Sequence, residues 1–134
     1  MHQTTQGIHH LGLTVKDIRE TSAFLCGQLD FKVIGEKPDY PAIFVSNGTI
    51  MLTLWQVKGS SATVSFDRHH NIGLHHFALK VVDRATLESL CEKLEEGHCG
   101  VNIEFKPEPL GQTGAFHMMC TIPGGIRVEF IAAK

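Results

Sequence analysis

Residues 8–17, IHHLGLTVKD, and residues 74–83, LHHFALKVVD, are two versions of one segment, and this repetition is the strongest clue to the architecture. Five of the ten positions are identical, where unrelated segments of ordinary composition would share about one or fewer. Both copies begin with paired histidines and end at an aspartate that can start a helix. The repetition predicts a duplicated chain with a histidine at the same structural place in each half.

The first half predicts one strand, one helix and three further strands. Residues 8–16 alternate as a strand does, and Asp17 can cap a helix, with Glu20 three residues later. An apolar stripe is expected on that helix from Ile18, Leu25 and Leu29. Three runs are typical of short strands: 31–35, 42–45 and 49–57.

The second half repeats this order. Asp83 is expected to cap a helix that Gly97 ends, after a strand over 74–82. The remaining strands are expected at 101–105, 115–121 and 126–131. The order predicts an α+β fold of two tandem βαβββ modules within one domain, residues 1–134. The modules span about 7–57 and 72–133, joined by a linker over 58–71.

Strand parity selects three candidate metal ligands. Side chains alternate along a strand, so His10 faces away from the apolar residues of the first strand, and His76 holds the matching place in the second copy. On the last strand Glu129 alternates with apolar Val128 and Phe130. Two imidazoles and a carboxylate suit Zn, Fe(II), Mn or Ni and leave positions open for water or substrate. We therefore expect a divalent metal ion, whose identity the sequence leaves open, on His10, His76 and Glu129.

Composition narrows the possible partners. The chain of 134 residues has a net charge of −2 and no basic cluster, so no nucleic-acid partner is expected. No apolar stretch is long enough to cross a bilayer and no secretory signal is apparent, which predicts a cytoplasmic protein without a membrane partner. The four cysteines lack metal or disulfide spacing and are expected to be reduced. A small-molecule substrate fits these bounds best.

These motifs resemble the vicinal oxygen chelate superfamily, which includes glyoxalase I, the fosfomycin-resistance enzymes, methylmalonyl-CoA epimerase and extradiol dioxygenases. The resemblance covers the chain from about residue 7 to residue 131 and is carried by residues 10–17, 76–79 and 122–129. It implies that the two modules curl into a mixed sheet around a metal cleft, and it implies the same three ligands that strand parity selects.

The departures from the family pattern bear on the reaction. Glyoxalase I has a glutamate that serves as ligand and base at the position of Met51, and methionine cannot take a proton, so ordinary glyoxalase I isomerisation is disfavoured. Extradiol dioxygenases usually place a tyrosine where Met119 stands. The fosfomycin-resistance enzymes have a threonine at the position of Gly12 and a longer tail that carries an arginine.

The resemblance also implies a pocket and an acid/base residue. The family pattern directs four mostly apolar side chains into the cleft as candidate substrate contacts: Met51, Thr53, Trp55 and Met119. Glu129 and His117 are the candidate catalytic residues, because the pKa range of imidazole suits proton transfer. His9 and His75 are expected to pack or to donate hydrogen bonds from outside the ligand set.

Three functions of different classes remain open at this point. The leading hypothesis is a metal-dependent enzyme that chelates a small substrate through two neighbouring oxygens, of lyase, isomerase or transferase type. Lactoylglutathione lyase-like or extradiol dioxygenase-like activity is an alternative within this class. The other classes are a metal-free protein that sequesters an antibiotic or another ligand, as bleomycin-resistance proteins do, and a vestigial fold that serves as an interaction subunit.

A homodimer is expected. Members of the superfamily pair their modules within one chain or between two, so His10 and His76 of one site could come from the same subunit or from different subunits.

Overall fold

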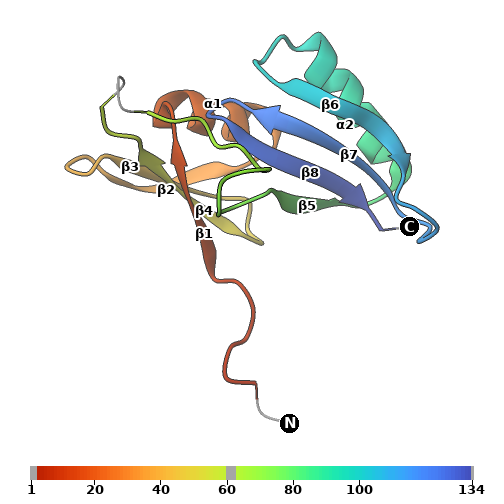
Figure 1. Cartoon of the computed structure of the whole chain (residues 1–134), viewed down its shortest axis with the longest axis horizontal. Coiled ribbons are helices and arrows are strands. Elements are labelled where there is room, and N and C mark those ends of the chain that lie inside the picture. The colour runs from red at the N-terminus through yellow and green to blue at the C-terminus, as the bar shows by residue number, and fades with distance from the viewer. Residues whose placement is uncertain (1–2, 60–62, 134) are drawn as a thin grey trace. The chain divides into compact units, whose positions relative to one another are not determined.

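The computed structural model describes residues 3–59 and 63–133, and the chain divides into two compact units, residues 1–63 and 64–134. Residues 60–62 of the predicted linker lie outside the described residues. Each unit is a βαβββ module with its own four-stranded mixed sheet (Figure 1). The prediction of an α+β fold built from two such modules is confirmed.

The first unit holds its helix against a sheet of four strands. Its elements are β1 (His10–Val15), α1 (Ile18–Gln28), β2 (Lys32–Lys37), β3 (Ala42–Ser46) and β4 (Met51–Gln56). The strand order is β1-β4-β3-β2, in which β1 and β4 are parallel and the other pairs are antiparallel. The N-terminal strand therefore lies at one edge, next to the last strand of its own module (Figure 1).

The helix of the first unit begins where the sequence indicates. The Asp17 carboxylate accepts hydrogen bonds from the backbone N–H groups of Arg19 and Glu20, which satisfies donors that have no partner within the helix. Phe24 and Leu25 are buried, in contrast to Leu29, which is the C-cap residue of α1 and only half-buried. The predicted stripe therefore holds at its start and ends one turn early.

The second unit repeats this plan. Its elements are β5 (Phe77–Val81), α2 (Arg84–Glu96), β6 (Asn102–Pro109), β7 (Phe116–Ile122) and β8 (Ile126–Ala132). The strand order β5-β8-β7-β6 matches that of the first unit, again with one parallel pair, β5 and β8. The two modules share one topology, as the repeated segment predicts.

The second helix buries an apolar face. Asp83 accepts a hydrogen bond from the backbone N–H of Thr86, and Gly97 is the C-cap residue, as expected. The buried side chains of α2 are Leu87, Cys91 and Leu94. The strand predicted from residue 74 begins only at Phe77, so both repeated histidines of this copy precede β5.

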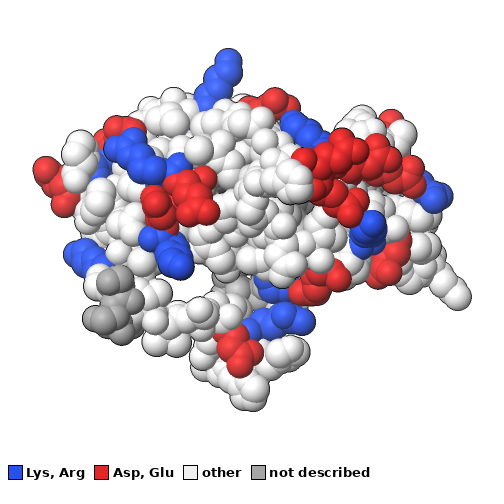
Figure 2. Space-filling model, turned by 90° about the horizontal axis from the view of Figure 1, so that it is seen from above, with Lys and Arg blue, Asp and Glu red and all other residues white. Residues whose placement is uncertain are grey.

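Charged side chains of both signs lie on the surface. Figure 2 shows lysine and arginine side chains interspersed with carboxylates on the face that it presents. Within the described residues, no helix is both long enough and apolar enough to span a bilayer.

Candidate functional site

One face of the second sheet carries several polar side chains that lie close together. Strand register pairs Glu129 on β8 with Ala78 on β5 and Met119 on β7. Because side chains alternate along a strand, Arg127 shares this face with Glu129, while the fully buried Val128 points to the opposite side. The sheet thus aligns a carboxylate and a guanidinium two residues apart on one strand.

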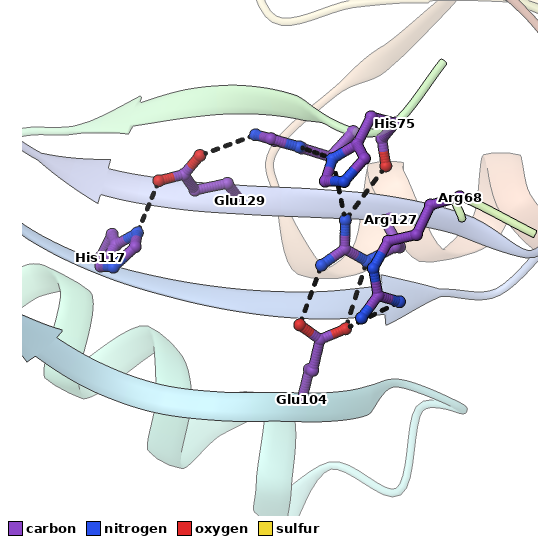
Figure 3. Close-up of polar contacts among 7 residues, drawn as sticks. Arg68, His75, Glu104, His117, Arg127 and Glu129 are labelled. Carbon is purple, nitrogen blue, oxygen red and sulfur yellow. Dashed lines mark hydrogen bonds and ion pairs between the residues drawn. The ribbon is translucent and has the colours of Figure 1, made fainter. Parts of the chain in front are cut away.

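The Glu129 carboxylate lies between two imidazole rings. Nε2 of His76 is 3.0 Å from Oε1, and Nδ1 of His117 is 2.6 Å from Oε2. Figure 3 shows the His117 ring directed at this carboxylate from the neighbouring strand. Glu129 is only 9% exposed, and a buried carboxylate needs hydrogen-bond partners of this kind to offset its lost hydration. The sheet therefore brings together three predicted site residues.

His76 and Glu129 fit two adjacent positions around one metal ion. Donor atoms held 2.0–2.2 Å from an ion at tetrahedral or octahedral angles stand roughly 2.8–3.6 Å apart, and Nε2 and Oε1 are 3.0 Å apart. Within the described residues, no group of three or more histidine, cysteine, aspartate or glutamate side chains is arranged to hold an ion. The second unit thus holds two residues that could bind an ion together with a third donor, while His117 is hydrogen-bonded to the other carboxylate oxygen of Glu129.

The first unit places His10 beside Met51. The two residues are register partners on β1 and β4, so their side chains leave the sheet on the same face. Nδ1 of His10 is 2.9 Å from Nδ1 of His9, which leaves its Nε2 uninvolved in that contact. Met51 brings a thioether, which is a weak acceptor and no base, to the side of the exposed imidazole.

Thr53 and Trp55 continue this face along β4. The indole Nε1–H of Trp55 donates to the hydroxyl of the buried Thr53 at 2.9 Å. Tyr40 meets the Trp55 ring edge-on at 4.6 Å between centroids, and Phe44 lies 5.9 Å from it. Sequence reasoning missed Tyr40 and Phe44; the register of β3 with β4, which pairs Phe44 with Thr53, is the signal that identifies the second. The first unit therefore offers an aromatic wall, formed by Tyr40, Phe44 and Trp55, beside the Thr53 hydroxyl.

His117 and Met119 lie two residues apart on β7, so their side chains share one face of the second sheet. Met119 is 6% exposed, and the side chain of His117 is 12% exposed. The ring of Phe105 meets the His117 imidazole edge-on at 4.9 Å between centroids. Packing and the bond to Glu129 together hold the His117 ring in one orientation.

A polar network beside Glu129 has no counterpart in the sequence predictions. Nε and Nη2 of Arg127 donate to the two carboxylate oxygens of Glu104, at 3.2 and 2.8 Å, and Nη1 is 3.2 Å from both Nδ1 and the carbonyl oxygen of His75 (Figure 3). The hydrogen bonds from Arg127 lower the pKa of Glu104. Partial burial, followed by the charge of Arg127, lowers the pKa of His75. The sequence does carry one sign of this network, because the alternation of Arg127 with Val128 predicts that Arg127 lies on the same strand face as Glu129.

His69 and His70, in the predicted linker, form hydrogen bonds within a local turn. Nδ1 of His70 is 2.7 Å from Oδ2 of Asp67, whose other oxygen accepts from the backbone N–H of His69. Hydrogen bonds to these two residues lower the pKa of Asp67. The His70 side chain is 81% exposed, so this pair belongs to the solvated surface.

Comparison with known proteins gives one family. Residues 7–130 match the model of the Glyoxalase/Bleomycin resistance protein/Dioxygenase superfamily. No curated protein matches the chain.

Solved structures share the fold at low sequence identity. A glyoxylase/bleomycin resistance protein/dioxygenase domain from Frankia sp. EAN1pec is 21% identical with a TM-score of 0.80, covering 98% of this chain and 94% of its own. A lactoylglutathione lyase from Agrobacterium tumefaciens is 20% identical with a TM-score of 0.74, covering 97% and 96%. The fosfomycin resistance protein FosX from Listeria monocytogenes is 18% identical with a TM-score of 0.74, covering 98% and 96%.

Proposed function

Because the chain belongs to the Glyoxalase/Bleomycin resistance protein/Dioxygenase superfamily, we propose that it is a divalent-metal-dependent enzyme. His76 and Glu129 bind the ion, and His10 is the third ligand, from the same chain or from the second subunit of a homodimer. The observation that carries the proposal is the 3.0 Å approach of His76 Nε2 to Glu129 Oε1, with His117 bound to the other oxygen. This donor set suits Zn, Mn, Ni or Fe(II).

The substrate is a small molecule with two neighbouring oxygens. A divalent ion with three protein ligands keeps positions open for both oxygens and supplies Lewis-acid polarisation of the bond between them and carbon. The apolar side chains of Met51, Trp55 and Met119 bind the rest of the substrate, and the Thr53 hydroxyl contributes a polar contact. These residues favour a compact, largely apolar molecule over a highly charged one.

His117 moves the proton in this proposal. Its Nδ1–H donates to Glu129, so the neutral ring keeps its lone pair on Nε2, where it can accept a proton. Glu129 therefore acts twice, as a metal ligand through Oε1 and as the group that orients His117 through Oε2. A carboxylate that fixes the tautomer of a histidine is a recurrent arrangement for general bases.

The reaction is of lyase, isomerase or transferase type. Met51 cannot act as the base that a glyoxalase I-like isomerisation uses at this position, so lactoylglutathione lyase activity would have to rely on His117 instead. Met119 cannot relay a proton, which makes extradiol dioxygenase-like activity the weaker alternative.

Metal titration of the full-length protein tests the proposal. We expect about one Zn²⁺ or Mn²⁺ per chain in the wild type by calorimetry and elemental analysis, and at least a 10-fold loss of affinity in H76A, E129Q and H10A. H70A is the matched control, because His70 is exposed and bonded to Asp67, and it should bind as the wild type does. Equal metal content in the wild type and H76A would contradict the proposal.

A metal-free sequestering protein is the second candidate. The aromatic wall of Tyr40, Phe44 and Trp55 favours it, since stacking rings can capture a planar ligand without an ion. The same titration separates the two functions. A sequestering protein would bind no ion in the wild type, yet an apolar aromatic ligand would quench the fluorescence of Trp55, the only tryptophan of the chain.

A further inference from the structure

We propose that Arg127 and His75 are positioning residues that fix the tautomer of His76, so that its Nε2 presents a lone pair toward Glu129 and the metal. This inference rests on the proposed function in taking His76 as a ligand. The groups involved form one continuous chain of contacts on the second unit, from Glu104 through Arg127 and His75 to His76.

The first step is the orientation of the Arg127 guanidinium. Glu104 receives two N–H groups of Arg127, and a third nitrogen, Nη1, faces His75. Two parallel hydrogen bonds to one carboxylate set the plane of a guanidinium as well as its position. The Arg127 side chain is only 12% exposed, and Arg68 adds a further positive contact to Glu104 at 3.6 Å. The nitrogen that faces His75 is therefore held in place from the opposite side.

The second step is the tautomer of His75. A guanidinium has five N–H donors and no acceptor, so the His75 nitrogen that faces it has to be the acceptor of the pair. Nδ1 of His75 lies 3.2 Å from Arg127 Nη1, which also donates to the His75 carbonyl oxygen at 3.2 Å. Arg127 thus favours the form of His75 that carries its proton on Nε2.

The third step is the tautomer of His76, which follows from that of His75. Nδ1 of His76 lies 2.7 Å from Nδ1 of His75, and since the His75 nitrogen is an acceptor, the His76 nitrogen has to donate. A neutral His76 with its proton on Nδ1 has its lone pair on Nε2. That nitrogen and Oε1 of Glu129 are 3.0 Å apart, so either a proton shared between them or a bound metal ion satisfies both atoms.

The first unit contains the same histidine contact without the arginine. Nδ1 of His9 and Nδ1 of His10 are 2.9 Å apart, but within the described residues no arginine is hydrogen-bonded to either ring. The repeated segment therefore provides an internal comparison, because substitution of Arg127 should change the nitrogens of His75 and His76 and leave those of His9 and His10 as they are.

Nitrogen NMR of the metal-free, ¹⁵N-histidine-labelled protein directly tests this relay, by which Arg127 sets the tautomer of His75 and His75 sets that of His76. We expect the wild type to show His75 with its proton on Nε2 and His76 with Nδ1–H, and R127Q to lose this pattern at both rings but not at His9 and His10. A wild-type His75 that carries its proton on Nδ1 overturns the inference, and so does an R127Q spectrum identical to that of the wild type.

Zinc affinity measured with a competing chelator gives the second readout. R127Q and H75L should bind Zn²⁺ about 10–100-fold more weakly. H75N should recover most of the affinity, because the amide oxygen of asparagine can accept the proton of His76 Nδ1. R84Q is the matched arginine control, since Arg84 pairs with Glu88 on the exposed surface of α2. R127Q with wild-type affinity would overturn the inference. If the wild type binds no zinc, the proposed function fails, while the nitrogen spectra still decide the relay.

Discussion

At the scale of the residue, Glu129 shows how a carboxylate can be buried and still be available as a functional group. An ionised carboxylate on a buried face is costly unless each oxygen has a partner, and in this chain one oxygen meets His76 and the other meets His117. Replacing Glu129 with glutamine keeps the shape but removes the negative charge and changes one of the two acceptor positions into a donor, which cannot bind a cation. The effect of E129Q on metal binding is therefore an effect of charge and donor pattern at one residue.

Cys120 gives a prediction at the same scale. Burial raises the pKa of its thiol to about 12, so about one molecule in ten thousand carries the reactive thiolate at pH 8. We expect iodoacetamide at pH 8 to leave Cys120 unmodified in the native protein, while the half-buried Cys26 and Cys99 react. Peptide mass mapping after brief labelling checks this, with labelling in guanidinium as the control. Equal labelling of Cys120 and Cys26 in the native state would contradict it.

At the scale of the element, the caps set where each helix begins. Asp17 and Asp83 hold corresponding places in the repeated segment, and each accepts backbone N–H groups at the start of its helix. The helices in turn cover the apolar face of each sheet and leave the opposite face free for the polar residues. The caps thus contribute indirectly to the placement of the candidate site.

The Asp17 cap predicts a measurable loss of stability. D17A removes the acceptor for the N–H groups of Arg19 and Glu20 and should lower the free energy of unfolding by about 1 kcal/mol. D17N and D17S retain a capping oxygen and should lose much less. Urea unfolding followed by circular dichroism measures the difference. A D17A midpoint equal to that of D17S would count against the cap as the cause.

The contact between β6 and β8 predicts a pH dependence. The hydrogen bonds from Arg127 hold the pKa of Glu104 below its ordinary value of 4.5. A carboxyl with a lowered folded-state pKa stabilises the native state above its unfolded pKa, and this contribution disappears as the pH falls through the folded pKa. We expect the wild type to be more stable than E104Q at pH 6–8 and the difference to shrink below about pH 4.5. Urea midpoints for both proteins at pH 7, 5, 4 and 3 test the sign. A difference that grows with acid would refute it.

At the scale of the whole molecule, the proposed metal site would need residues from both modules, of one chain or of two. In the proposal, the second unit supplies His76, Glu129 and His117, and the first supplies His10 with the aromatic wall of Tyr40, Phe44 and Trp55. Each unit forms its own sheet from its own strands, so a metal site on the three proposed ligands would require both modules.

Metal binding should therefore raise the stability of the molecule. A ligand present at 100 times its Kd stabilises the native state by about 2.7 kcal/mol, which corresponds to a rise in Tm of about 10 °C for a chain of this size. We expect this rise with Zn²⁺ or Mn²⁺ in the wild type and in H70A, and little change in H76A or H10A. Differential scanning calorimetry with and without chelator measures it. An equal rise in H76A would place the ion elsewhere.

Much of the fold and part of the site could be predicted because they depend on local periodicity. The alternation along residues 126–131 is enough to place Glu129 opposite Val128, and Asp83 with Thr86 is a local capping pair. Two predictions at the ends of elements were wrong. Leu29 does not continue the buried stripe of α1, and the second-half strand does not start at residue 74, because packing and strand pairing decide where elements end. Tyr40 and Phe44 were missed because their contact with Trp55 depends on the register of β3.

The sequence by itself determined the duplicated α+β plan, the starts of both helices and the strand faces on which Met51, His117 and Glu129 lie, whereas His76 precedes β5. These features follow from helix and strand periods and from hydrogen bonds between near neighbours, so they can be read from the chain. Only the tertiary structure decided that Glu104 and Arg127, on strands separated by β7, close a network onto His75. Such contacts depend on strand order, register and side-chain rotamers, which no local pattern encodes.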